Sequence, residues 1–193
     1  MSINARQLPN LLTLSRIALV PVLILVLKDR DYAAALWVFL FAGISDGLDG
    51  WIAKRWRYTT RFGAILDPVA DKFLLVTSYV MLMLLDHLPF WLVLTVAFRD
   101  LLIVGGYLAY TSMVGAVKMD PSQLSKLNTL AQIMLVLVVL VHEASGFNYP
   151  LLLDALVLIV FVTTVASGVH YVWIWGVLKE MKPAKAARRT RKA

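Results

Sequence analysis

Four aspartates lie within a stretch of 26 residues that is otherwise rich in apolar side chains. Asp46 and Asp49 are three positions apart, and Asp67 and Asp71 are four apart. On a helix, each spacing places both carboxylates on one face. Carboxylates beside long apolar runs are costly, and four of them stay ionised close together only with cations between them. The pattern therefore predicts a functional site that holds cations.

Hard divalent cations are the ions that carboxylate oxygens suit best. Two helices with two carboxylates each can hold one or two Mg²⁺ or Mn²⁺ ions, and a pair of such ions stabilises the attacking and leaving oxygens in phosphoryl transfer. The residues between the aspartates fit a phosphate-bearing ligand. Gly50, Ala53 and Gly63 are small and allow close approach of a ligand or of a neighbouring helix, and Lys54 adds positive charge.

The elements that must position these residues are long apolar helices. The chain has 193 residues, of which 60% are hydrophobic and 16% charged, a composition that is too apolar for an ordinary soluble domain. Six apolar runs are each near the ~20 residues that a bilayer-crossing helix needs; they cover 8–27, 32–53, 63–85, 89–111, 123–141 and 150–178. We expect an all-α polytopic membrane protein with six transmembrane helices and a short interfacial helix before Leu8. Pro68, directly after Asp67, predicts a helix start or a kink at that point.

The distribution of basic residues predicts the orientation. With both termini on one side, the connections and termini of that side hold fourteen lysines and arginines, and the other side holds only Lys28 and Arg30. This asymmetry predicts cytoplasmic termini and a cytoplasmic aspartate site, in a plasma membrane of the bacterial inner-membrane type. Arg16, Lys72 and Arg99 are left within or at the edges of spans.

Residues 1–181 are expected to form one domain, and residues 182–193 a disordered basic tail. The absence of cysteine excludes disulfides and thiolate chemistry. A nucleic-acid partner is not expected, because the sequence shows no basic face with base-reading groups. Two classes of function remain open. One is a metal-dependent transferase, and the other is a membrane cation transporter, which would also use intramembrane carboxylates but usually has broken helices and duplicated halves.

The spacing of these residues resembles the signature of the CDP-alcohol phosphatidyltransferases. Asp46-x-x-Asp49-Gly50-x-x-Ala53-Lys54, eight residues, then Gly63-x-x-x-Asp67-x-x-x-Asp71 is similar to the family pattern D-x-x-D-G-x-x-A-R, eight residues, G-x-x-x-D-x-x-x-D. The resemblance extends over most of the chain through the six-span layout. Lys54 departs from the family arginine: it keeps the charge but loses the bidentate fork.

The resemblance implies a role for each matching residue. The metal ligands would be Asp46, Asp49, Asp67 and Asp71, and Asp71 would also be the general base. The CDP-binding residues would be Gly50, Ala53, Lys54 and Gly63. The implied reaction is the attack of an alcohol hydroxyl on the phosphorus attached to diacylglycerol in CDP-diacylglycerol, with release of CMP. The resemblance also implies a homodimer.

The acceptor alcohol has to be identified from residues outside the signature. Pro121-Ser122-x-x-Ser125-Lys126-x-Asn128-Thr129 resembles the CMP-forming cardiolipin synthases, whereas phosphatidylglycerophosphate synthases more often have lysine where Asn128 stands. Asn128 therefore removes one cation, which a dianionic glycerol phosphate needs more than the singly charged phosphodiester of phosphatidylglycerol does. This favours phosphatidylglycerol as the acceptor, with glycerol 3-phosphate as the alternative. Arg99 and Lys126 are predicted to contact the acceptor phosphate; the other interpretation makes them helix-end anchors or partners of Asp100. The three histidines are interpreted as incidental, and Glu143 and Asp154 receive no role.

Overall fold

Six helices make up the described part of the chain. The computed structural model describes residues 8–56, 63–114, 123–147 and 150–177, and within these ranges it has no strand. The helices are α1 (Leu8–Lys28), α2 (Tyr32–Trp56), α3 (Gly63–Leu84), α4 (Phe90–Val114), α5 (Gln123–Ser145) and α6 (Pro150–Val177). The all-α class is confirmed, and the helix bounds follow the predicted runs within a few residues. α3 begins at Gly63, the first residue of the predicted run, so Pro68 lies inside the helix. Of the two alternatives predicted at Asp67, the helix start is wrong and the kink stays a prediction. The predicted interfacial helix and basic tail lie outside the described residues.

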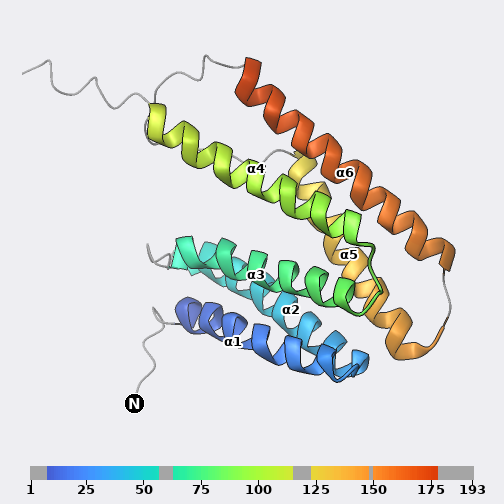
Figure 1. Ribbon diagram of the computed structural model, residues 1–193. Helices are drawn as coiled ribbons and strands as arrows, with labels where there is room; N and C mark the ends of the chain where they lie inside the picture. The colour runs from blue at the N-terminus through green and yellow to red at the C-terminus, as the bar shows by residue number, and fades with distance from the viewer. Residues whose placement is uncertain (1–7, 57–62, 115–122, 148–149, 178–193) are drawn as a thin grey trace, which may run out of the picture.

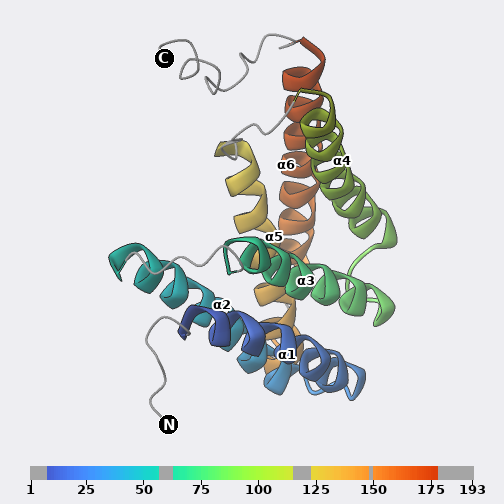
Figure 2. The same ribbon diagram turned by 90° about the vertical axis from the view of Figure 1, so that its left-hand side faces the viewer.

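The helices form two groups, which α5 joins. α1 packs against both α2 and α3, and α4 packs along α6. α5 contacts α2 and α3 on one side and α6 on the other. Figure 1 and Figure 2 show the pair α4 and α6 set apart from α1, α2 and α3. α3 and α4 follow each other in the chain and lie close at their connection, but they share few close contacts along their length.

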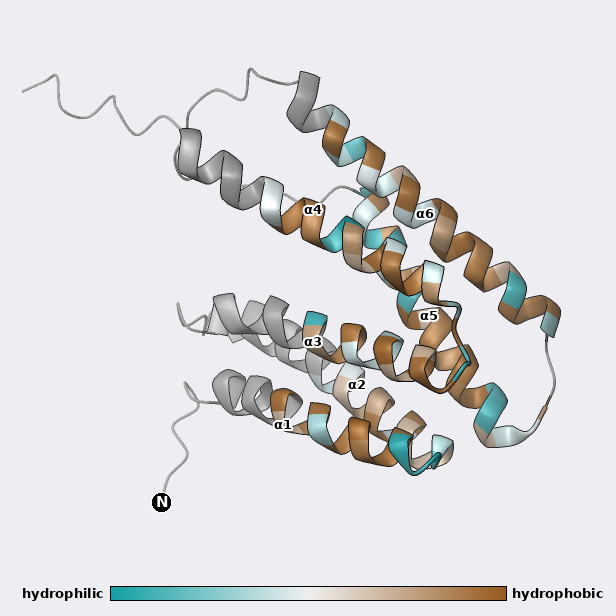
Figure 3. Cartoon of the chain, in the orientation of Figure 1, coloured by the Kyte–Doolittle hydropathy of each residue, from teal (hydrophilic) through white to brown (hydrophobic). Residues whose placement is uncertain are grey.

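Apolar side chains lie on the outside of the described bundle as well as in its core, and a few polar side chains are buried. Large apolar side chains such as Trp37, Leu101 and Leu151 are 71–83% exposed, whereas the polar side chains of Asn128 and Gln132 are fully buried. Figure 3 shows hydrophobic residues over most of the visible length of α6. Such an extensive apolar surface fits contact with lipid rather than water. Two helices of the described part, Gln123–Ser145 and Pro150–Trp173, are long and apolar enough by themselves to cross a membrane.

Charged residues turn the chain sharply after α1 and α3. Arg30 and Asp86 adopt the left-handed backbone conformation, with φ of 58° and 62°. The backbone N–H groups of Asp31 and His87 then reach back to carbonyls in the last turns of α1 and α3, which ends each helix in a Schellman-type cap. The carboxylate of Asp31 accepts a hydrogen bond from the Ala34 amide at 3.0 Å and so caps the start of α2.

Candidate functional site

The aspartates of the signature lie on two helices at one end of the bundle. Asp46 and Asp49 belong to the second half of α2, and Asp67 and Asp71 belong to the first turns of α3. Residues 57–62 alone join α2 to α3, which limits the distance between these helix ends to about 25 Å, and both helices pack against α1. The helical backbone supports the spacing argument for both pairs. The side chains of residues 46–56 and 63–71 are outside the described set, so the metal-binding and CDP-binding roles stay predictions.

Arg99 is the buried cation of the described bundle. Its side chain, on α4, is 5% exposed. Its Nε and Nη2 donate to the hydroxyl of Ser167 on α6 at 3.3 and 2.7 Å, and Nη2 also donates to Ser125 on α5 at 2.6 Å. Nη1 donates to Asp100 at 2.7 Å. The pairing with Asp100 agrees with the second interpretation of Arg99, and contact with an acceptor phosphate remains a prediction.

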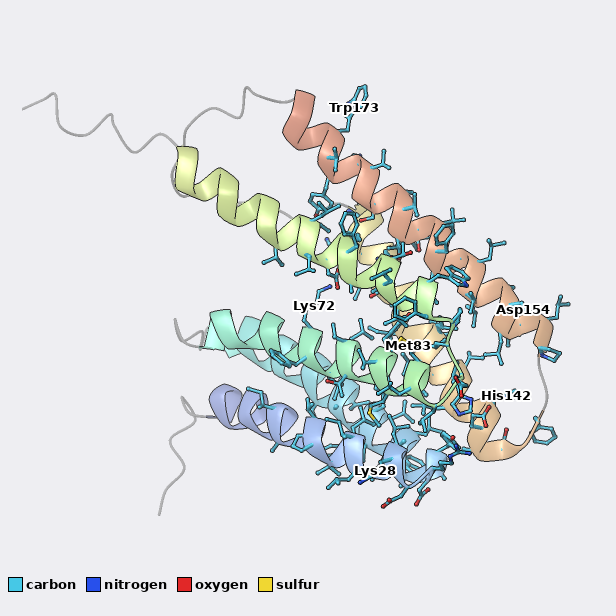
Figure 4. All side chains as sticks on the ribbon, in the orientation of Figure 1. Lys28, Lys72, Met83, His142, Asp154 and Trp173 are labelled. Atoms are coloured by element: carbon cyan, nitrogen blue, oxygen red, sulfur yellow. The ribbon has the colours of Figure 1, made fainter. Side chains whose placement is uncertain are left out.

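Lys72 extends this network from α4 to α3. Its ammonium group donates to the second carboxylate oxygen of Asp100, and Figure 4 shows Lys72 extending from α3 toward α4. Asp100 therefore lies between two cations that come from different helix groups. The sequence placed Lys72 and Arg99 at span edges but did not predict that one carboxylate connects them. Lys126, next to Ser125 on α5, is exposed.

Asn128 holds α5 against α6 one turn further into the bundle. It is fully buried, and its Oδ1 accepts hydrogen bonds from the hydroxyls of Thr163 at 2.9 Å and Thr164 at 2.8 Å. Its Nδ2 has no hydrogen-bond partner among the described residues, nor have the side-chain amide atoms of Gln132 on the next turn. Asn128 is the position at which the cardiolipin synthases and the phosphatidylglycerophosphate synthases differ, and here it forms an uncharged contact between α5 and α6.

An apolar groove lies beside Arg99, between α4 and α6. Its volume is about 620 Å³. Gly168 leaves room on the α6 side, where an added Cβ would meet only the Cγ of Arg99 at 3.7 Å. Ten residues line the groove; they are Thr95, Phe98, Arg99, Leu102, Thr164, Val165, Gly168, Val169, Val172 and Trp173. Its polar side chains are those of Arg99 and Thr164, which are buried, and of Thr95, which is half-buried, while the remaining lining is hydrocarbon.

Two histidines converge on one glutamate at the opposite end of the bundle. Glu143 Oε1 lies 3.0 Å from Nδ1 of His142 and 3.3 Å from Nδ1 of His87, and Tyr32 hydrogen-bonds Nε2 of His87 at 2.8 Å. The labelled His142 in Figure 4 marks this end. The sequence interpretation missed this cluster, although His87 and the pair His142-Glu143 both follow apolar runs that end on the same side. Among the described residues, no group of three or more potential ligands forms a metal-binding set.

Comparison with known proteins agrees with the spacing of the aspartates and glycines. Residues 6–176 match the CDP-alcohol phosphatidyltransferase family. The chain is 33% identical over 184 residues to the CMP-forming cardiolipin synthase of Rattus norvegicus, covering 87% of this chain and 61% of the rat protein. It is 36% identical over 146 residues to a probable CMP-forming cardiolipin synthase of Drosophila melanogaster, covering 67% of this chain and 45% of the fly protein.

A bacterial relative is similar to the chain over nearly its whole length. The chain is 32% identical over 192 residues to the CDP-diacylglycerol--glycerol-3-phosphate 3-phosphatidyltransferase of Bacillus subtilis, covering 90% of this chain and 97% of that protein. The chain therefore spans less than two thirds of the animal relatives and nearly all of the bacterial one. The match over most of the chain, together with these relatives, shows that the protein belongs to the CDP-alcohol phosphatidyltransferase family.

Proposed function

We propose that this protein transfers a phosphatidyl group from CDP-diacylglycerol to phosphatidylglycerol, with release of CMP, and so acts as a CMP-forming cardiolipin synthase. The observation that carries the reaction class is the full set of signature aspartates on two helices that end at the same side of the bundle. Family membership supports the donor, because this family takes its name from CDP-alcohols.

The signature residues divide the chemistry between them. Carboxylate oxygens from two helices form a hard donor set that suits Mg²⁺ or Mn²⁺, and two bound ions would neutralise the diphosphate of the donor. Asp46, Asp49, Asp67 and Asp71 would hold the ions. Gly50, Ala53 and Gly63 would give the CDP group close access to the backbone, and the charge of Lys54 would offset part of the negative charge of its phosphates.

Asp71 supplies the proton-accepting group of the reaction. Its carboxylate takes the proton of the acceptor hydroxyl, whose oxygen forms a bond to the phosphorus attached to diacylglycerol. The bond between that phosphorus and the bridging oxygen breaks, and the electron pair leaves with CMP. Both substrates carry their acyl chains in the bilayer, so the site works at the boundary between lipid and water.

Two features of the described bundle favour a lipid as the acceptor. Asn128 is neutral, fully buried and hydrogen-bonded to α6, so this position adds no cation for a dianionic phosphate. The groove between α4 and α6 is apolar and reaches Arg99, which fits an acyl chain whose phosphodiester lies toward the cationic end. Arg99 and Lys126 are the side chains that we assign to that phosphodiester.

The deciding experiment compares acceptors with the purified protein. CDP-diacylglycerol is incubated with Mn²⁺ or Mg²⁺ and either phosphatidylglycerol or glycerol 3-phosphate, and CMP and the lipid product are measured. Cardiolipin formed with phosphatidylglycerol is the expected result. Phosphatidylglycerophosphate as the sole product would show that the acceptor is glycerol 3-phosphate and not phosphatidylglycerol. Cation flux in vesicles without CMP release would instead indicate a transporter.

A substitution in the groove tests the acyl-chain assignment. Gly168→Leu fills the groove next to Arg99, whereas Gly105→Leu adds the same side chain on α4 at a position where an added Cβ meets nothing within 4 Å. We expect Gly168→Leu to raise KM for phosphatidylglycerol and to leave KM for CDP-diacylglycerol near the wild-type value. Equal effects of the two substitutions would show that the groove does not bind the acceptor.

Glycerol 3-phosphate is the second candidate acceptor. The Bacillus subtilis relative, whose name specifies this acceptor, is similar to the chain over 97% of its own length. Its level of identity, 32%, is close to the 33% of the rat cardiolipin synthase. Identity alone therefore does not separate the two acceptors, and the product analysis above does.

We also propose that all six helices cross a bacterial-type inner membrane, with both termini and the aspartates on the cytoplasmic side. Helix lengths of 21–28 residues are enough to cross a hydrocarbon core of ~30 Å. The excess of lysine and arginine at one end supports this orientation. Labelling of single cysteines introduced into the cysteine-free chain would test it, and cross-linking would test the homodimer.

A further inference from the structure

The described bundle contains one charged connection between its two helix groups. Lys72 belongs to α3 in the group that carries the signature, and Asp100 belongs to α4 in the other group. Asp100 also accepts from Arg99, which donates to α5 and α6 through Ser125 and Ser167. A single network thus joins four helices, and we call Lys72, Asp100 and Arg99 the charge bridge.

The place of the charge bridge on α3 links it to the reacting residues. Lys72 directly follows Asp71, so the two residues are one helical step apart, a rise of about 1.5 Å along the axis of α3. Pro68 has no backbone N–H, so the first turns of α3 lack one of the hydrogen bonds that normally hold a helix together. A side-chain contact at residue 72 therefore restrains a helix start that has fewer bonds of its own.

The surroundings explain why this restraint matters at one end only. At the α3–α4 connection, the two helices are held together by a short chain segment, residues 85–89. Beyond this connection the two helices share few close contacts, and Lys72 extends toward α4 (Figure 4), where it donates to Asp100. The buried half of the charge bridge is firmly held, because Arg99 makes four hydrogen bonds and its side chain is 5% exposed.

We infer that Asp100 and Lys72 are positioning residues for the transfer reaction: the charge bridge sets the position of the first turns of α3, and with it Asp67 and Asp71, against the helices of the acceptor side. This inference depends on the proposed function for its kinetic consequence. Its structural part, a restraint of α3 against α4, can be measured without any activity. A shift of about 1 Å in a reacting group lowers a rate on the order of 100-fold.

The kinetic experiment uses Lys72→Met, which removes a partly exposed cation and keeps the aliphatic chain. We expect kcat to fall roughly 10- to 100-fold, while KM for CDP-diacylglycerol and for the acceptor stays near the wild-type values. Lys72→Arg keeps the pairing and is expected to restore kcat. Asp100→Asn is expected to lower kcat as well, and the double variant to lose no more kcat than the more impaired of the two single variants, because both changes break the contact between Lys72 and Asp100. Lys28→Met, an exposed lysine at the far end of α1, is the matched control.

The structural experiment measures the distance between α3 and α4 with spin labels. The chain has no cysteine, so labels at Val76→Cys and Leu101→Cys, both exposed, report on these two helices alone. Lys72→Met should broaden the distance distribution of this pair and leave a pair on α1 and α2, Leu25→Cys with Trp37→Cys, unchanged.

The outcomes separate the inference from the proposed function. Unchanged kcat and unchanged distances in Lys72→Met would overturn the positioning role. A lower kcat with unchanged distances would also overturn it, because Lys72 would then act on the substrate directly. If the wild-type protein released no CMP with either acceptor, the proposed function would fail, while the distance measurement would still decide whether the charge bridge restrains α3.

Discussion

Substitution of Asn128 by leucine separates the structural role of this residue from any role in choosing the acceptor. The change keeps the approximate volume and removes the carbonyl oxygen that accepts from Thr163 and Thr164. Thr163 keeps a partner, since its hydroxyl also lies 2.8 Å from the carbonyl of Ile159. Thr164 is fully buried and loses its acceptor on α5.

The size of the effect follows from these contacts. Hydrogen bonds between membrane helices contribute about 0.6 kcal/mol on average and up to about 1.7. A buried hydroxyl without a partner costs about 1–3 kcal/mol, and a helical threonine can lower this cost by bonding to the carbonyl one turn earlier. Asn128→Leu also removes the buried Nδ2, which has no partner among the described residues. We therefore expect a loss of about 1 kcal/mol in the free energy of unfolding.

A double-mutant cycle with Thr164→Val tests the reasoning. Replacing both partners by apolar groups of similar shape is nearly neutral, so the double variant should be about 0.5–1.5 kcal/mol more stable than the sum of the single changes predicts. Unfolding in mixed detergent micelles, followed by circular dichroism, gives the free energies. Thr95→Val is the matched control, because the Thr95 hydroxyl bonds to its own helix at the Trp91 carbonyl. Strictly additive effects of Asn128→Leu and Thr164→Val would refute the assigned contact.

Three further substitutions have distinct expected results. Asp71→Asn should lower CMP release at least about 100-fold, as loss of a general base does, with thermal stability retained; full activity with every acceptor would remove Asp71 from that role. Lys54→Arg restores the family residue and should lower KM for CDP-diacylglycerol by about a factor of five, measured at saturating acceptor, whereas a higher KM would show that the chain is adapted to lysine. Glu143→Gln weakens the contacts to His87 and His142 and should lower the unfolding free energy by about 1 kcal/mol or less, with kcat unchanged; a large loss of activity would connect the far end of the bundle to the reaction.

The helix bounds were predictable to within a few residues because most of the apolar runs end next to a charged residue. Lys28 closes α1, and Pro150 opens α6 at the predicted residue. The spacing of the signature also survives in the structure, since each aspartate pair lies in one continuous helix. The alternative of a helix start at Asp67 was wrong because α3 continues through Pro68, its sixth residue, at the loss of one backbone hydrogen bond.

Contacts between helices were not predictable from the sequence. Periodicity gives the angle between two residues on one helix, but it does not give the rotation of that helix against its neighbours. Lys72 and Asp100 are 28 positions apart, and Asn128 and Thr164 are 36 apart, so nothing local in the sequence indicates either pairing. The sequence interpretation considered only that Asn128 replaces a lysine and removes a charge. The structure shows that its amide oxygen accepts hydrogen bonds from α6 and so joins α5 to α6.

The sharp turns at the ends of α1 and α3 have a consequence for how the protein enters a membrane. Only residues 29–31 separate α1 from α2, and only residues 85–89 separate α3 from α4. Backbone hydrogen bonds from these connections to the preceding helix keep both connections short and fixed. In the proposed six-span topology, each pair would therefore insert as a helical hairpin, with the orientation of α1 setting that of α2. A nascent chain in which α3 is made before α4 cannot yet join Lys72 to Asp100.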